Sequence, residues 1–207
     1  MATPASTVNR VGKDLTVEQK VQQIREAFAD GPELARVALE KSLVSLQREL
    51  AAPSRRQSAG RSGARQGTVS ELTLLVPLVP GGAKRLRVLL QLLENNFQLA
   101  DAVGTVHDMR FVFLDNDTRL LFATAYDGEW DAYIDDFATK IPDALDMLLG
   151  NGVGYPGLHS PSVKDWIAKH QITADAWYVG NPNLTVAETR RLERVGKAVE
   201  ELLDKVG

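Results

Sequence analysis

The residues best suited to chemistry lie in one apolar stretch, Val106 to Leu114, which we predict to be a β-strand. Alternate residues of a strand face opposite sides, so His107 shares a side with Met109, whereas Asp108 and Arg110 share the other. A histidine among apolar side chains can ligate haem or act as a general base, or it can be a structural hydrogen-bonding residue. An Asp–Arg pair in a cleft could bind a polar substrate group, and otherwise it is an ion pair at a dimer interface or strand edge. We therefore take His107, Asp108 and Arg110 as candidate catalytic residues.

The other two histidines come after a glycine-rich segment that begins at Gly150. His159, together with Tyr155, could line the mouth of a pocket, and His170 lies near the expected end of a helix, where an imidazolium favours the helix dipole. His107, Tyr155 and His159 are thus the candidate cofactor-binding residues, with haem as the candidate cofactor. The three histidines have no zinc-ligand spacing, and no metal is expected.

Two stretches of the chain are strongly charged. Between residues 127 and 146 seven acids stand against one base, and Asp131 and Asp135 are one helical turn apart, a spacing that suits a bound cation or a solvated face. Residues 52–67 carry no acid, are rich in Pro, Ser and Gly, and contain Arg55, Arg56, Arg61 and Arg65. Because no aromatic residue stands between these arginines, the composition favours a flexible basic linker over a phosphate-binding segment.

The bulk composition excludes several classes of protein. The chain has 207 residues, 44% hydrophobic and 25% charged, as in ordinary globular proteins. Its net charge of −3 argues against nucleic acid as the main partner, and the absence of cysteine excludes disulfides and thiolate chemistry. Met1 to Val11 lacks a signal-peptide core, and no apolar run reaches the roughly 18 residues of a membrane span. We expect a cytoplasmic protein.

Helical patterns near the N-terminus predict a separate arm over residues 1–51, before the linker at 52–67 and a main domain at 68–207. Thr16 and Gln19 have the spacing of a capping box, and Pro32 suits the first turn of a second helix. That second helix carries an apolar stripe at Leu39, Leu43, Leu46 and Leu50. The stripe needs a partner.

Strand and helix patterns alternate in the main domain. The first predicted strand, Leu72 to Leu78, precedes a helix over residues 83–99, and two further strands flank the turn-forming cluster Asp115 to Thr118. Next come a helix kinked at Pro142, a short helix and a fourth strand over residues 172–179. This is the β-α-β-β-α-β order of a ferredoxin-like fold, an α+β protein with an antiparallel sheet.

The strands are apolar on both sides, although the helices of such a fold cover one sheet face only. The bare face must therefore meet another surface, most economically the same face of a second subunit, and we expect a homodimer. The terminal helix, capped by Thr185 and Glu188, has a seam for another helix at Leu192, Val195, Val199, Leu202 and Val206. Lys84, Arg85 and Arg87 mark either a nearby anion or a solvated face at the start of the helix over 83–99.

The segments Val106 to Leu114 and Leu120 to Trp130 resemble a group of bacterial proteins with a dimeric α+β-barrel, ferredoxin-like domain. Gly154 to Pro156 and Tyr178 to Thr185 are similar to later parts of that domain, so the resemblance covers about half the chain. The group lies loosely beside the dye-decolorising peroxidase and chlorite dismutase superfamily, whose enzymes hold haem through a proximal histidine. The resemblance implies a fold, whereas no histidine motif or Gly-x-x-Asp-Gly signature carries the activity over.

The sequence supports two functional hypotheses. In the first, the cavity between the sheets of a dimer binds a small apolar ligand or haem, as in an oxidoreductase, with His107, Asp108 and Arg110 as its polar groups. In the second, the chain is a non-catalytic assembly module, and its N-terminal and C-terminal helices dock onto partners or onto each other.

Overall fold

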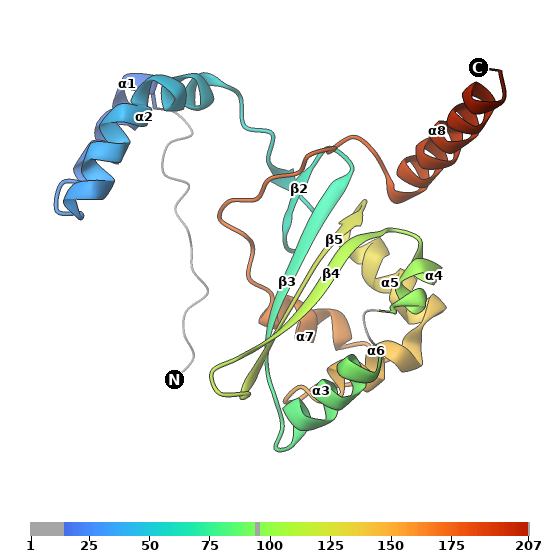
Figure 1. The fold of residues 1–207 in the computed structure, drawn as a ribbon. Coiled ribbons are helices and arrows are strands. Elements are labelled where there is room, and N and C mark those ends of the chain that lie inside the picture. The colour runs from blue at the N-terminus through green and yellow to red at the C-terminus, as the bar shows by residue number, and fades with distance from the viewer. Residues whose placement is uncertain (1–14, 94–95, 207) are drawn as a thin grey trace. The chain divides into compact units, whose positions relative to one another are not determined.

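The computed structural model describes residues 15–93 and 96–206, so the expectation for Met1 to Val11 lies outside the described residues. The chain divides into two compact units, Met1–Ser54 and Arg55–Gly207. Figure 1 shows their helices and strands. In the described part of the chain, no helix combines the length and hydrophobicity needed to cross a bilayer.

The first unit is a pair of helices, α1 (Val17–Ala27) and α2 (Glu33–Ala51). The predicted capping box is confirmed, because Thr16 Oγ1 accepts from Gln19 N and Gln19 Oε1 accepts from Thr16 N. Val21, Leu39 and Leu43 form a small buried core between the two helices. Leu46 and Leu50 are half-buried against the same core, so the whole predicted leucine stripe packs within this unit.

The second unit contains a five-stranded antiparallel sheet in the order β1-β2-β3-β5-β4. Its strands are β1 (Gln57–Ser58), β2 (Ala64–Gln66), β3 (Val69–Pro77), β4 (Val106–Leu114) and β5 (Arg119–Asp127). Its helices are α3 (Gly82–Leu93), α4 (Gln98–Val103), α5 (Trp130–Lys140), α6 (Pro142–Leu149), α7 (Val163–His170) and α8 (Val186–Val206). The protein is thus α+β, as predicted, and the sheet is not closed.

Strands β4 and β5 form the hairpin that the sequence predicted. Their register runs from Val106 opposite Tyr126 to Leu114 opposite Arg119. Asp115, Asn116 and Asp117 form the turn with φ between 52° and 66°, the left-handed region that Asn and Asp tolerate. Strands β3 and β4 both lie antiparallel to β5, so they are parallel to each other, and the helices α3 and α4 connect them.

One face of the sheet carries the main core. Leu72, Leu74 and Val76 of β3 and Phe122 and Tyr126 of β5 are buried against the helices that come after β5. These helices contribute Trp130, Tyr133, Ile134, Phe137, Leu145, Leu149, Val163, Trp166 and Ile167 to the same cluster. The break between α5 and α6 at Pro142 has the predicted cause, a proline at the start of a new helix.

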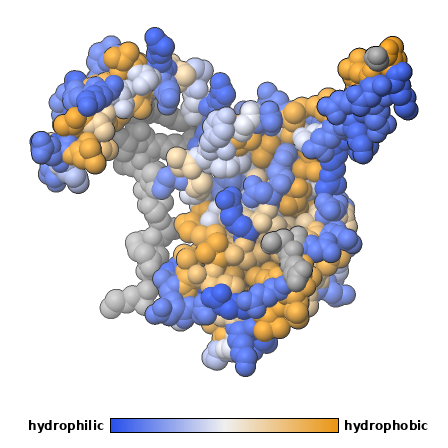
Figure 2. All heavy atoms as spheres, in the orientation of Figure 1, coloured by the Kyte–Doolittle hydropathy of each residue, from blue (hydrophilic) through white to orange (hydrophobic). Residues whose placement is uncertain are grey.

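The opposite face is only partly covered, and we call its uncovered part the open face. Alternation along the paired strands assigns to it Thr73, Leu75, Val112, Leu121 and Ala123, which are half-buried or exposed. In Figure 2, hydrophobic and near-neutral residues gather around the strands in the middle of the view.

The fourth strand predicted over residues 172–179 is wrong. Strand β2 already pairs with the N-terminal end of β3, through Arg65 opposite Ser70. Only the part of that edge after Ser70 is free for another strand. There Gln171 forms a single bridge with Leu74, and Ile172 N donates to Thr73 O at 2.9 Å. Beyond this point the chain continues as an irregular segment, because strand β2 occupies the place that a fourth strand needs.

Residues 57–66, which the sequence assigned to a flexible linker, instead form the hairpin β1–β2. Ala59 and Ala64 are buried, and Trp130 N donates to Ala59 O at 2.7 Å. The arginines hold the hairpin in place: Arg61 pairs with Asp165 at 2.7 Å, and Arg65 pairs with Glu129. Small buried alanines between polar residues give no apolar run, and this is why the composition resembled a linker.

A buried carboxylate joins the three segments that meet at the upper end of β3. Glu71 is 4% exposed, and its Oε1 accepts from Ala64 N at 3.0 Å and from Ala174 N at 3.2 Å. Its Oε2 accepts from the Thr73 hydroxyl at 3.3 Å. Glu71 therefore links β2, β3 and the irregular segment that replaces the predicted fourth strand.

Glu71→Ala is expected to lower the free energy of unfolding by roughly 2–4 kcal/mol, because it leaves two backbone N–H groups without an acceptor. Glu71→Gln keeps one acceptor oxygen and should lose less. Denaturant unfolding measures the stability, and hydrogen exchange at Ala64 and Ala174 reports the local effect. Equal exchange at both amides in all three proteins would contradict this role of Glu71.

Candidate functional site

His107 lies at a β-bulge at the start of β4, where the register shifts between Val106 and Asp108. Its Nε2 is 2.8 Å from Asp127 Oδ1, and the side chain is 23% exposed. The bulge turns the imidazole toward the end of β5 and away from the regular alternation that the sequence suggested. This contact gives His107 a hydrogen-bonding partner at the end of the sheet.

Asp127 connects this end of the sheet to helix α8. Its second oxygen, Oδ2, accepts at 2.9 Å from the backbone N of Val186, the first residue of α8. Asp127 does not cap the helix that follows it in the chain, because α5 begins after Glu129 without a side-chain cap. A carboxylate at the N-terminus of α8 also interacts favourably with the helix dipole. His107, Asp127 and Val186 thus form an anchor between strand and helix.

Asp108 and Arg110 lie together on the open-face side of β4, as period two predicted. Arg110 Nη2 is 3.4 Å from Asp108 Oδ1, and the side chains of Arg110 and Asp108 are 64% and 54% exposed. Their partners on β5 are Ala125 and Ala123, whose side chains are small. The pair is a solvated ion pair within one chain, so it provides no desolvated acid or base there.

The predicted cofactor residues do not meet within one chain. His107 lies at the end of the sheet where Val69 pairs with Asp127. The glycine-rich segment lies at the other end, where Leu78 bridges to Gly152. A nine-residue strand, β3, separates the two ends, which is a distance of about 25 Å.

Tyr155 and the segment around it are held by Asp146 of α6. Tyr155 donates from its hydroxyl to Asp146 Oδ1 at 2.6 Å, and Leu158 N donates to the same atom at 2.7 Å. The Tyr155 ring also packs edge-on against Trp166. Burial, and then the hydrogen bond to Asp146, raise the pKa of Tyr155. Tyr155 thus has a structural role, and His159 is exposed nearby in the chain.

A haem does not fit the residues predicted to bind it. The Nε2 of His107 is engaged by Asp127, and His159 lies on an exposed loop. Neither imidazole faces an enclosed apolar cavity in the described part of the chain. His170 lies at the end of α7 as predicted, and its Nδ1 donates to Trp166 O at 2.8 Å.

The charged stretches are neutralised by partners elsewhere in the chain. Lys164 Nζ lies 3.1 Å from Asp131 and 2.8 Å from Asp135, so a lysine occupies the position suggested for a cation. Among residues 15–93 and 96–206, no group of three or more His, Asp or Glu side chains could hold a metal ion.

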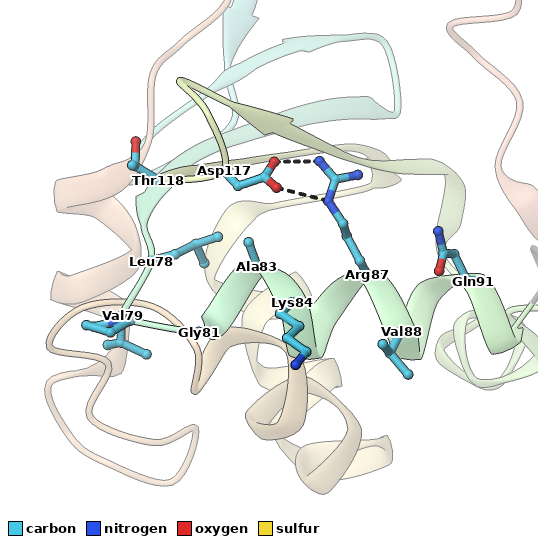
Figure 3. A pocket seen from close by; sticks show the side chains of 11 residues that line it. Leu78, Val79, Gly81, Ala83, Lys84, Arg87, Val88, Gln91, Asp117 and Thr118 are labelled. Carbon is cyan, nitrogen blue, oxygen red and sulfur yellow. Dashed lines mark hydrogen bonds and ion pairs between the residues drawn. The ribbon is translucent and has the colours of Figure 1, made fainter.

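A shallow groove of about 720 Å³ lies between α3 and the β4–β5 turn (Figure 3). The predicted nearby anion is Asp117, which accepts from Arg87 Nε at 3.2 Å and from Nη2 at 2.5 Å. Arg85 Nε donates to Asn151 Oδ1 at 2.8 Å. The basic residues at the start of α3 are thus partly explained by contacts within the chain.

Two stacked tyrosines form a buried polar site that the sequence analysis missed. The rings of Tyr126 and Tyr133 are 3.8 Å apart, and Tyr133 OH is 3.1 Å from Thr124 Oγ1. The hydroxyl of Tyr126 is buried without a hydrogen-bond partner among the described residues, and the nearby Ser70 hydroxyl, which donates to Gly128 O, acts to lower its pKa. Burial is the main cause that raises the pKa of both tyrosines. In the sequence, each of these tyrosines stands on the core-facing side of its strand or helix, and this placement was the signal that could have revealed the site.

Comparison of the chain with protein-family models, with curated proteins and with solved structures finds no match.

Tyr126→Phe is expected to leave the free energy of unfolding unchanged or to raise it by up to about 1 kcal/mol, because it removes a buried hydroxyl without a partner. Tyr133→Phe removes the hydrogen bond to Thr124 and should cost about 1 kcal/mol. Denaturant unfolding of both variants checks the contrast. A larger loss of unfolding free energy for Tyr126→Phe than for Tyr133→Phe would show that the Tyr126 hydroxyl makes the more stabilising contact, contrary to the prediction.

Proposed function

We propose that the chain is a non-catalytic assembly module that brings copies of itself together through helix α8. The observation that carries this proposal is the apolar stripe of α8, whose members are all between 49% and 77% exposed. They are Leu192, Val195, Val199, Leu202, Leu203 and Val206. The predicted seam is therefore left largely uncovered by the described residues.

The physical chemistry of an isolated helix supports this proposal. A helix of 21 residues in water gains most of its stability from packing an apolar face, and α8 has no such packing beyond its first turn. Val186 is buried and Arg190 pairs with Asp101, so the first turns are anchored to the sheet unit. The remaining turns gain stability from a partner that covers the stripe.

The charges of α8 favour a second, antiparallel copy of this helix as that partner. Its first half, residues 190–197, holds four bases and one acid, and its second half, residues 198–206, holds three acids and one base. Antiparallel pairing places the basic half of one helix beside the acidic half of the other. Gly196 and Ala198 flank the seam with little bulk, which lets two helices approach closely.

The contacts of the candidate catalytic residues support an assembly role over catalysis. His107 contributes to the anchor of α8, and Asp108 and Arg110 pair with each other in solvent. Tyr155 is tied to Asp146. A catalytic site needs such groups to converge on one place, and here they are distributed over both ends of the sheet.

We also propose that the sheet unit is a ferredoxin-like unit. The order β3, helices, β4, β5, helices, with β5 between β3 and β4, supports a ferredoxin-like unit whose last strand is replaced by the irregular segment after Gln171. A homodimer that covers the open face would give the α+β-barrel arrangement that the sequence resemblance implied.

Val199→Glu with Leu202→Glu is expected to halve the mass of the assembly that α8 holds together, because carboxylates replace apolar groups in the seam. Light scattering over a concentration series measures the mass. The matched control, Val88→Glu with Leu92→Glu, places two carboxylates at exposed apolar positions of α3 and should leave the mass unchanged. An unchanged mass for the double variant would remove α8 from the interface.

A second arm of this experiment tests the other apolar helices. Deletion of residues 1–54 removes the whole of the first unit, whereas the buried Ala59 shows that a longer deletion would cut into the sheet. If α8 pairs with α8 of another copy, the number of copies should stay the same, and the mass should fall only by that of the deleted residues. A change in the number of copies would instead identify α1 and α2 as the partner of the stripe.

A second candidate function, binding of a small apolar anion between two sheets, is favoured by one observation. Arg110 lies opposite Ala123 on the open face, so an exposed guanidinium, paired with Asp108, stands beside small apolar side chains. In this function Asp108 would orient the guanidinium of Arg110. His107 would contact Asp127 and not the anion.

The probe for this second function is anilinonaphthalene sulfonate, an aromatic anion, added to the Val199→Glu, Leu202→Glu variant so that α8 does not bind it. Arg110→Gln should weaken binding at least threefold by fluorescence titration, whereas Lys84→Gln, which removes an exposed charge elsewhere, should not. Equal binding by all three proteins would exclude a ligand site at Arg110.

A further inference from the structure

Strand β4 is the longer of the two edge strands of the sheet, and its outer side is unpaired. It has nine residues, whereas β1 at the other edge has two. In the described part of the chain, β4 forms backbone hydrogen bonds with β5 alone. About half of its N–H and C=O groups therefore point outward and are free to pair with another strand.

The composition of β4 favours such pairing over protection from it. Natural edge strands are commonly protected by proline, lysine, short length or a β-bulge. β4 has no proline or lysine, and its one bulge lies at its start, so the strand is regular from Asp108 onward. Its sequence is rich in Val and Phe, which suit strands. Its charged residues are one Asp and one Arg, two positions apart on one side of the strand.

We infer that β4 pairs antiparallel with β4 of a second copy, in the register that places Met109 on a twofold axis. In this register Asp108 of each chain lies directly opposite Arg110 of the other, and the two ion pairs are related by symmetry. An axis through Arg110 would instead place two guanidinium groups opposite each other, and an axis through Asp108 would oppose two carboxylates. Of the registers that bring these charged residues face to face, charge complementarity favours the one centred on Met109, with a second copy of this chain as the occupant.

The pairing would join two five-stranded sheets into one continuous sheet. Asp108 and Arg110, now a solvated pair 3.4 Å apart within one chain, would each gain a partner from the other chain. This contact does not use α8, so it can hold or fail independently of the assembly proposed for that helix.

Charge reversal tests the inference. The background is the full chain with Val199→Glu and Leu202→Glu, which removes the contact proposed for α8 and leaves β4 intact. In this background we expect a dimer by light scattering. Asp108→Arg and Arg110→Asp should each reduce the mass to that of a monomer, because each variant opposes like charges across the axis.

Restoration makes the test specific to the register. An equimolar mixture of the Asp108→Arg and Arg110→Asp proteins should return to the dimer mass, and so should the single chain that carries both substitutions. Circular dichroism checks that each variant keeps its fold, which is expected because both side chains are exposed. A monomeric background protein, unchanged mass in the single variants, or failure of the mixture to dimerise would each overturn the inference.

One further variant separates the edge from the open face. Leu121→Glu places a charge on β5 in the middle of the open face and leaves β4 intact. The dimer should persist in the same background. A monomer would show that copies meet through the open face and would overturn the pairing of β4.

Discussion

The hydrogen bonds of the buried Glu71 carboxylate determine how the upper end of the sheet is built. Burial of a carboxylate is costly unless donors surround it, and Glu71 receives two backbone N–H groups and a hydroxyl. One donor belongs to β2 and one to the segment after α7, so a single side chain fixes both against β3. Because β2 is fixed there, no strand can form over residues 172–179. Glu71 also holds the segment after α7 against β3. From there this segment continues along the chain to Val186, where α8 starts.

Much of the fold could be predicted from local patterns. Alternation of apolar residues, together with a turn cluster in left-handed conformation, was sufficient for the β4–β5 hairpin, and the capping boxes at Thr16 and Thr185 marked the starts of α1 and α8. These features depend on residues within a few positions of each other. The same holds for the break at Pro142, where the proline alone ends one helix and begins the next.

The failed predictions all depend on contacts between distant residues. The hairpin β1–β2 is held by ion pairs to Asp165 and Glu129, which lie 104 and 64 positions away from their arginines, and no local pattern encodes them. The apparent cation site at Asp131 and Asp135 is filled by Lys164, and Asp127 caps a helix that starts 59 residues later. The candidate site was less predictable than the fold for this reason: alternation placed Asp108 and Arg110 correctly, but a bulge redirected His107 toward Asp127.

Several charges that local patterns leave without a partner are paired inside the chain. Arg61, Arg87 and Lys164 each contact an acidic side chain of the same chain. The stripe of α8, the open face and the outer side of β4 have no such internal partner among the described residues. The first two gain stability by losing contact with water, and the third gains it by completing backbone hydrogen bonds. In a twofold contact each surface meets the identical surface of the other copy. A second copy is therefore the simplest partner for all three surfaces.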